Sequence, residues 1–265
     1  MKKRKNKQAW KLEKPREKNK KGKNEKKLSF NILKIFILLG IVLLVVFFVW
    51  EMYYILGLIG LILIYFSASL YFILSGDKPY SKSWNYLKEC KSHVLLIILI
   101  FLLSGILALY YQPPEVVDIV MQIMEELVQK TEGLGMWQMI IFILNNNLQS
   151  SFFGMILGLV LGIFPVMTAF ANGYILGFVA EKSVAVSGVG VLWRLAPHGI
   201  FELPAIFISL ALGTKLGMFI TSGKGKIKKE FLRRLEQTLR VFLFVVIPLL
   251  IIAAIIEGIL IIALG

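Results

Sequence analysis

Long apolar runs constrain the fold of this chain more than any other feature of its sequence. Residues 94–111 contain no charged side chain, and residues 241–264 contain one, Glu257. A helix needs about 20 apolar residues to cross a hydrocarbon core of about 30 Å, so runs of this length are typical of membrane-spanning helices. The composition agrees, because 57% of the residues are hydrophobic and the mean hydropathy is +0.76. We therefore expect an all-α, polytopic transmembrane helical bundle in the cell membrane.

The N-terminal residues have the opposite character. Residues 1–29 hold fourteen Lys and Arg against three Glu, which gives a net charge of +11. No apolar periodicity runs through them, so we expect a disordered basic tail. A cleavable signal peptide has a short basic region and an apolar core of about 7–15 residues followed by small residues. Here the basic region is longer and no such cleavage pattern follows, so we expect the first apolar segment to remain in the mature protein.

The charges between the apolar runs predict a topology. Residues 30–50 and 52–74 are expected to form an N-terminal transmembrane hairpin, and residues 75–93 a loop with a net charge of +2. Lys and Arg concentrate in loops on the cytoplasmic side of membrane proteins. The tail, with the N-terminus, and this loop are therefore both predicted to be cytoplasmic, and residues 94–111 would lead outwards.

Residues 112–136 differ from both the spans and the basic loops. Apolar residues recur at helical spacing from Glu115 to Leu127, and acidic residues interrupt them. The whole segment holds one Lys against five acids, a net charge of −4. This pattern predicts one external amphipathic helix that lies at the interface and does not cross the membrane.

The apolar sequence after this acidic loop is interrupted several times. The interruptions lie at 145–147, at 172–173 and at 197–199. Residues 224–240 then carry seven Lys and Arg against two Glu, a net charge of +5 that predicts a cytoplasmic loop before a final span at 241–264. An odd number of crossings must therefore separate the external loop from this basic loop.

Two arrangements satisfy that parity. In the one we favour, residues 147–171 cross once, residues 174–191 run along the cytoplasmic side, and residues 192–218 enter and leave the membrane through the break at 197–199. In the other, three helices cross. We expect about six crossings for the chain, with broken or re-entrant helices in the core. Irregular backbone at membrane depth has to be sheltered by protein or water, so the breaks predict a covered polar site.

Glycines recur at intervals of four within the apolar segments. On a helix this spacing makes a flat stripe of small residues that lets a second helix approach closely. We expect packing within the chain as the main role of the stripes, with a dimer or partner interface as the alternative. The glycines are Gly154, Gly158, Gly162, Gly173, Gly177, Gly213 and Gly217.

A small set of polar residues lies in apolar sequence around residue 198. Arg194, His198 and Glu202 are spaced by four and would share one face of a helix. Ionisable groups are costly in hydrocarbon and usually mark a bundle interior or a functional site. Three interpretations stay open: a structural ladder, a proton- or ion-responsive element based on the histidine, or a latch contacted by a partner protein. The candidate core polar site comprises Asn146, Arg194, Pro197, His198, Gly199 and Glu202.

Two short amide motifs have simpler interpretations as helix ends. Asn147 or Ser150 would cap the start of a span at 151–171, unless one amide of the run turns inward. Asn172-Gly173 is typical of a helix C-terminus, where glycine commonly supplies the left-handed conformation.

Enzyme chemistry is poorly supported by the sequence. The chain has two histidines, His93 and His198, and one cysteine, Cys90. It contains neither the zinc-protease pattern nor a phosphate-binding loop. We expect no catalytic residues, no metal ligands and no cofactor, and we interpret Cys90 as a bystander thiol in a loop at the membrane surface.

The order of these motifs resembles the stage II sporulation protein M family over residues 94–265. The most specific shared element is Pro197-His198-Gly199-x-x-Glu202. The resemblance implies a multi-spanning membrane protein without known enzymatic activity. In endospore-forming bacteria, the founding member of that family acts as a membrane anchor that recruits peptidoglycan-remodelling enzymes during engulfment. The positions that match the family pattern are Asn146, Gly173, Pro197, His198, Gly199 and Glu202.

These observations favour a non-catalytic scaffold or anchor in a membrane-associated complex. The alternative is a small-solute or ion permease that uses the broken-helix polar site. The basic tail would bind anionic lipid headgroups, each Lys contributing about 1 kcal/mol near the surface. Unknown protein partners and a homo-oligomer are both compatible with the sequence, whereas nucleic acid is disfavoured because the tail has few aromatic residues among its cations.

Overall fold

The structure, a computed structural model, describes residues 54–74, 78–223 and 226–264. Two units divide the chain, residues 1–78 and residues 79–265. The first contains α2, an apolar helix over Tyr54–Leu74. The expected basic tail and the first predicted span, residues 30–50, lie outside the described residues.

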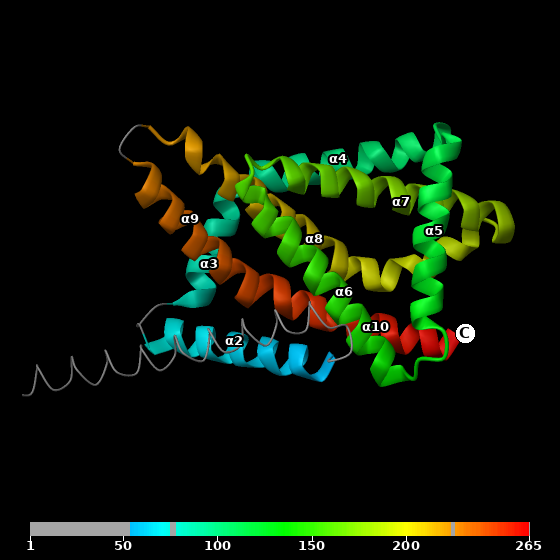
Figure 1. Cartoon of the computed structure of the whole chain (residues 1–265), viewed down its shortest axis with the longest axis horizontal. Coiled ribbons are helices and arrows are strands. Elements are labelled where there is room, and N and C mark those ends of the chain that lie inside the picture. Colours follow the sequence, from blue (N-terminus) through cyan, green and yellow to red (C-terminus); the bar gives the residue numbers. More distant parts are fainter. Residues whose placement is uncertain (1–53, 75–77, 224–225, 265) are drawn as a thin grey trace, which may run out of the picture. The chain divides into compact units, whose positions relative to one another are not determined.

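The second unit is built from helices throughout its described part (Figure 1). Five of its helical segments are long and apolar enough to cross a membrane, namely Lys91–Tyr110, Met136–Leu159, Ile163–Ser187, Gly199–Thr221 and Ile227–Ala263. An all-helical, membrane-type fold is thereby confirmed. The α-helices are α3 (Pro79–Glu89), α4 (Lys91–Tyr110), α5 (Pro114–Thr131), α6 (Met136–Ile156), α7 (Ile163–Ser187), α8 (Ala196–Gly217), α9 (Ile227–Val241) and α10 (Ile247–Leu264).

Several short segments of other helical geometry join these elements. The 3₁₀ segments are Leu157–Leu159, Val189–Leu195 and Met218–Thr221. A π-helical turn, Phe242–Val246, connects α9 to α10 without a loop. The regular α-helical geometry is therefore interrupted at helix ends and at this π-helical turn.

The predicted amphipathic helix is present as α5. Pro114 stands in its first turn, where its missing N–H costs nothing. Val120 is buried, and Val116, Val117 and Met124 pack with it against α4 and α7. The acidic side chains lie on the remaining, exposed surface, among them Glu115, Asp118, Glu125 and Glu126.

The re-entrant path expected for residues 192–218 is wrong. Those residues form a 3₁₀ segment followed by α8, a continuous helix of 22 residues. Pro197 lies in the first turn of α8, where no intrahelical hydrogen bond requires its nitrogen, so it opens the helix and does not break it. Residues 174–191, expected along the membrane surface, belong mostly to α7. Three helices of spanning length therefore occupy the region, as in the second arrangement of the predicted topology.

The two amide motifs are not helix ends either. The run 145–147 lies inside α6, which begins at Met136 with the Gly135 N–H donating to Gln138 Oε1 at 2.9 Å. Asn172-Gly173 lies inside α7. Gly173 has a different reason to be glycine, because a Cβ there would collide with the Phe101 carbonyl of α4.

Close backbone contacts organise the bundle into two parallel helix pairs. In the first pair, α4 lies beside α7, and a Cβ on Gly177 would overlap the Gly105 carbonyl. In the second pair, α6 and its 3₁₀ extension lie beside α8, and a Cβ on Gly158 would overlap Gly213. The two pairs run in opposite directions, and α10 packs against α6 and α8 (Figure 1).

The remaining predicted glycines take part in the same contacts. A Cβ on Gly217 would meet Gly158 and Gly162, and Gly154 faces the side chain of Leu210. Gly162 has a φ of 72°, a left-handed conformation that glycine adopts at little cost. It ends the turn between α6 and α7 directly against Thr214. The glycine intervals therefore mark places where the helix backbones approach closely.

Candidate functional site

The predicted polar residues around residue 198 lie where the 3₁₀ segment becomes α8. Arg194 belongs to the 3₁₀ segment, whereas His198 and Glu202 are four residues apart in α8. The three residues therefore do not share one uninterrupted α-helical face, although the last two still do. The side chains of residues 194–198, including Pro197, are outside the described part of the structure.

The other members of that predicted site are described. Glu202 is half-buried on α8. Gly199 has space around it, because a Cβ at that position would meet only the Leu203 side chain of its own helix, at 3.6 Å. Asn146 is exposed on α6 and donates from Nδ2 to Oδ1 of the buried Asn147 at 3.4 Å. The starts of α6 and α8 lie toward the same end of the bundle, but Asn146 bonds within its own helix and not to α8 (Figure 1).

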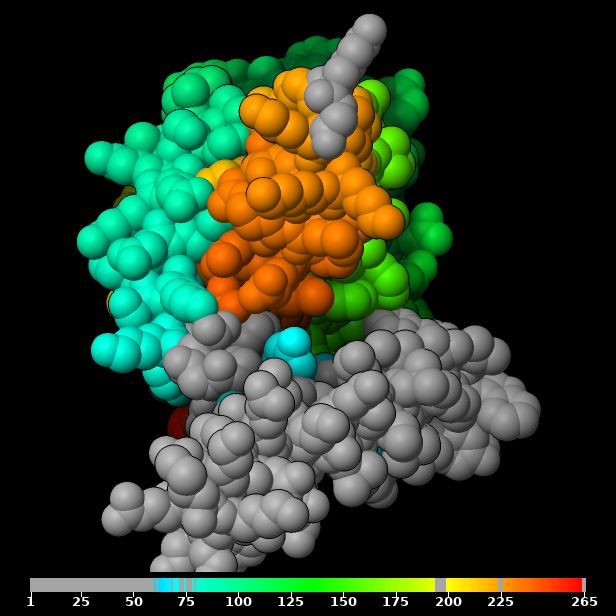
Figure 2. All heavy atoms as spheres, turned by 90° about the vertical axis from the view of Figure 1, so that its left-hand side faces the viewer, coloured from blue at the N-terminus to red at the C-terminus, as the bar shows by residue number. Residues whose placement is uncertain are grey.

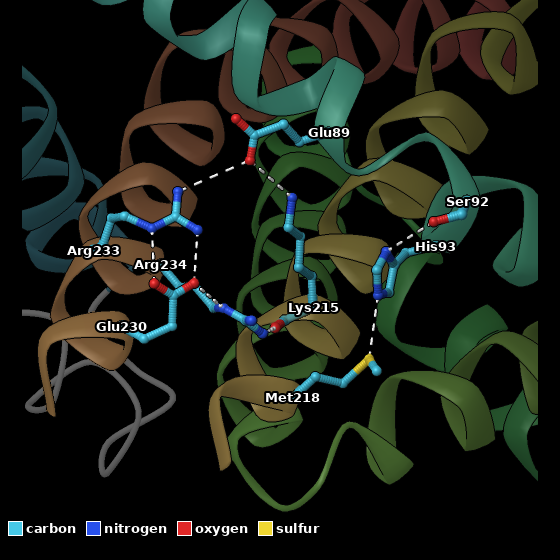
Figure 3. Close-up of polar contacts among 8 residues, drawn as sticks. All are labelled: Glu89, Ser92, His93, Lys215, Met218, Glu230, Arg233 and Arg234. Carbon is cyan, nitrogen blue, oxygen red and sulfur yellow. Dashed lines mark hydrogen bonds and ion pairs between the residues drawn. The ribbon is translucent and has the colours of Figure 1, made fainter. Parts of the chain in front are cut away.

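The best-defined polar cluster lies at the opposite end, where α3, α4, α8 and α9 meet. We call this the basic-end cluster and define it as Glu89, Lys215, Glu230, Arg233 and Arg234 (Figure 3). Figure 2 looks onto this end and shows orange α9 directly beside teal α3 and the start of α4.

Lys215 is the centre of the basic-end cluster. It stands in the last turn of α8 and is only 8% exposed. Its ammonium Nζ lies 3.3 Å from Glu89 Oε2 and 4.3 Å from the centre of the Tyr86 ring. A buried ammonium needs such partners, since burial of an unpaired charge is costly. The contacts attach α3 to α8.

Salt bridges within α9 hold the side chains of two arginines toward the ends of α3 and α8. Glu230 accepts hydrogen bonds from Arg233 Nη2 at 2.7 Å and from Arg234 Nε at 2.9 Å. Arg233 Nη1 also lies 3.9 Å from Glu89 Oε2. Arg234 Nη1 donates to the Lys215 carbonyl at 2.7 Å, which satisfies one of the carbonyls that a helix leaves unpaired in its last turn. The arginines thus fix α9 to the ends of α3 and α8.

Two buried side chains that can lose a proton, a phenol and a thiol, lie next to this cluster. Tyr86 is 2% exposed and Cys90 is fully buried. Burial raises the pKa of the Tyr86 phenol to about 12 and the pKa of the Cys90 thiol to about 11. Both groups are therefore neutral at pH 7, and Cys90 lacks the thiolate character of a reactive cysteine. Cys90 stands in the turn between α3 and α4, as expected of a connecting segment, but its side chain is buried there.

His93 lies near this end and has two polar neighbours. Its Nε2 is 3.3 Å from Met218 Sδ, and its Nδ1 is 3.4 Å from Ser92 Oγ (Figure 3). No group of three or more His, Cys, Asp or Glu side chains is gathered for a metal among the residues that the structure describes.

Three charged residues that matter structurally were not assigned to any site from the sequence. Lys215 is a single basic residue between Gly213 and Gly217, and the surrounding sequence did not indicate that it would be buried. Arg240 is fully buried and donates from Nη2 to Glu236 Oε1 at 2.6 Å, a pairing that the spacing of four residues could have indicated. Glu257 lies inside α10, and its Oε2 is buried without a hydrogen-bond partner in the described residues.

Comparison with known proteins identifies the family. A family model described as Stage II sporulation protein M matches residues 94–260, which reach from the first turn of α4 into the end of α10. The chain belongs to the stage II sporulation protein M family. The match contains Lys215 and the α9 arginines of the basic-end cluster, whereas α2, α3 and Glu89 precede it.

A curated relative of this family member has no assigned activity. It is an uncharacterized protein of Methanocaldococcus jannaschii, 35% identical over 107 residues, which cover 39% of this chain and 48% of that protein. The chain therefore aligns with about half the length of this relative. No solved structure matches the chain.

Proposed function

We propose that this member of the stage II sporulation protein M family is a non-catalytic scaffold or anchor component of a membrane-associated complex. The observation that carries the proposal is the glycine-mediated contact within each parallel helix pair. Backbones packed this closely form a frame with little freedom to open. A scaffold needs such a frame, because it has to hold its extramembrane parts in constant positions.

Two extramembrane parts are held in this way. On one side, α5 packs its apolar face on α4 and α7 and leaves an acidic surface exposed. On the other side, α3 and α9 are tied to α8 by the basic-end cluster. Surfaces fixed to a rigid frame are suited to contact partner proteins.

The proposed orientation places the basic-end cluster in the cytoplasm and α5 outside. Positive charge favours the cytoplasmic side, and crossings by α4, α6, α7 and α8 in turn would bring α9 back to the side on which α3 lies. We propose the cell membrane as the location and a cytoplasmic N-terminus, with the basic tail binding anionic headgroups. Protein partners would then meet either α5 outside or the α3–α9 surface inside.

Site-specific photocrosslinking in native membranes tests the scaffold proposal. A photoreactive phenylalanine at Ile123 or Leu127, both exposed on α5, should give adducts with a partner protein. The same residue at the buried Val120 is the matched control and should give none. If every position yields only the monomer, also after chemical crosslinking at α9, the scaffold proposal fails.

A permease is the second candidate, and Glu257 is the observation in its favour. A carboxyl oxygen that is buried in an apolar helix, with no hydrogen-bond partner among the described residues, is the kind of group that marks ion and proton pathways in membranes. Proteoliposomes containing a pH-sensitive dye would report proton flux. Flux that Glu257→Gln abolishes would favour the permease, and wild-type protein without flux would remove a proton pathway from consideration.

A further inference from the structure

An apolar groove of about 510 Å³ runs along the outside of the second unit between α3, α4 and α8. On α4 it is lined by Val94, Leu95 and Ile98, which lie on one face of the helix because of their spacing. On α8 it is lined by Phe207 and Ile208. The groove therefore lies between two helices of spanning length, at a depth where lipid acyl chains would surround it.

One end of this groove is basic. Lys88 of α3 and Lys91 of α4 line it there with the apolar stems of their side chains, and both residues are exposed, so their ammonium groups stand at the edge of the groove. No acidic side chain is among the described residues that form its lining. The neighbouring carboxylate, Glu89, is already paired with Lys215. The two lysines are thus available to an anionic ligand.

Trp84 stands at the same end, beside the lysines. It is 58% exposed, and the Lys88 Nζ lies 5.9 Å from the centre of its ring. Tryptophan is favoured at the level of lipid headgroups, where its ring has apolar and polar surroundings. The seven residue-to-residue steps from Lys91 to Ile98 extend the groove by about 10 Å along α4, at about 1.5 Å per step. The basic end and the apolar length of the groove therefore lie in the same order as the headgroup and the acyl chains of a phospholipid.

We propose that this groove binds an anionic phospholipid. Its phosphate would lie between Lys88 and Lys91 next to Trp84, and one acyl chain would lie along Val94, Ile98 and Phe207. The occupant is assigned on charge complementarity, because a zwitterionic lipid would bring no net charge to two adjacent cations. The proposed site consists of residues of the second unit, and it combines an apolar groove with the two cations.

Tryptophan quenching by brominated lipids tests this proposal at the site itself. The full-length protein would carry Trp84 as its one tryptophan, with Trp10, Trp50, Trp137 and Trp193 replaced by Phe. Vesicles would contain dioleoyl phosphatidylcholine with increasing fractions of brominated phosphatidylglycerol or brominated phosphatidylcholine. The two quenching curves give the relative binding constant of the two lipids at Trp84.

Phosphatidylglycerol should bind about 30-fold more strongly than phosphatidylcholine, as expected for two lysines near a lipid with a net negative charge. Lys88→Gln with Lys91→Gln should bring this ratio close to one, and Lys88→Arg with Lys91→Arg should keep it. Lys228→Gln with Lys229→Gln removes the same charge from α9, where both side chains are also exposed, and should leave the ratio unchanged.

Three results would overturn the proposal. A wild-type ratio of one would show that the groove does not select anionic lipid. An unchanged ratio in the glutamine variant would place the selectivity elsewhere. Absence of quenching by either lipid would show that protein, such as residues 1–78 of this chain or a second copy, covers the groove.

Discussion

At the scale of single residues, the main feature of the structure is a lysine that is almost completely buried. The Lys215 ammonium has the Glu89 carboxylate on one side and the Tyr86 ring on the other. The two charged partners differ in exposure, because the Glu89 side chain is 54% exposed whereas that of Lys215 is 10% exposed. If Glu89 is removed, a buried charge loses its counterion, but if Lys215 is removed, the carboxylate remains hydrated. The two deletions should therefore have unequal effects.

We expect Glu89→Ala to lower the free energy of unfolding by about 1–2 kcal/mol, and Lys215→Met to lower it by less than about 1 kcal/mol. Thermal unfolding of the purified protein in detergent shows which of the two substitutions destabilises it more. Glu126→Ala removes an exposed acid from α5 and serves as the control, with little expected change. Equal losses from both substitutions would contradict the assigned role of burial.

The thiol of Cys90 gives a second prediction at this scale. Only the thiolate reacts with maleimides, and burial raises the pKa of Cys90 from its ordinary value of 9.0 to about 11. At pH 7 the raised pKa alone reduces the thiolate fraction about 100-fold. We expect the folded protein to react with N-ethylmaleimide at least about 100-fold more slowly than the denatured protein, with a rate that rises toward pH 11. Similar rates in both states would show that Cys90 is accessible.

At the scale of the helices, main-chain contacts between glycines determine how the bundle packs. The pair α4–α7 meets at Gly105, Gly173 and Gly177, and the pair α6–α8 meets at Gly158 and Gly213. Side chains cannot be inserted there without moving a backbone. Elsewhere, larger apolar side chains fill the space, as Ile97, Ile206 and Leu210 do between α4 and α8.

We expect Gly173→Ala to destabilise the protein by about 1–3 kcal/mol, because its Cβ would overlap the Phe101 carbonyl. Gly190→Ala is a matched control, since no heavy atom lies within 4 Å of a Cβ at that position. Its effect should be within about 0.5 kcal/mol. The two variants are compared by their melting temperatures in the same detergent, and equal stability would refute the close approach of α4 and α7.

At the scale of the whole molecule, the described helices account for the distribution of charge. Acidic residues gather on α5 at one end of the second unit, and basic residues gather on α9 at the other end. An odd number of crossings between them agrees with the positive-inside preference. The α6, α7 and α8 helices supply three segments of sufficient length.

Cysteine accessibility tests this arrangement. In a Cys90→Ala background, Glu126→Cys should react with a membrane-impermeant maleimide added to intact cells. Lys228→Cys should react only after permeabilisation. Both native side chains are exposed, so burial would not explain a difference. Reaction of both positions on the same side would require an even number of crossings between α5 and α9.

The sequence predicted those helices whose pattern is complete within one segment. It did not predict contacts that depend on how the helices pack together. The apolar run 94–111 and the amphipathic spacing 115–127 predicted α4 and α5, because each pattern is complete within one helix. Asn172-Gly173 indicated a helix end, since the sequence does not show that α4 approaches Gly173. The Lys215–Glu89 pair joins residues 126 positions apart, and no local pattern reports such a contact.

The paired glycine seams have a consequence for control of this protein. They consist of peptide groups and Cα hydrogens, which neither titrate nor oxidise and have no rotamers to exchange. Changes in acidity or ionic strength therefore have nothing to act on within the seams themselves. A physiological signal has to act on polar side chains outside the seams, and the seams would transmit it as movement of whole helices.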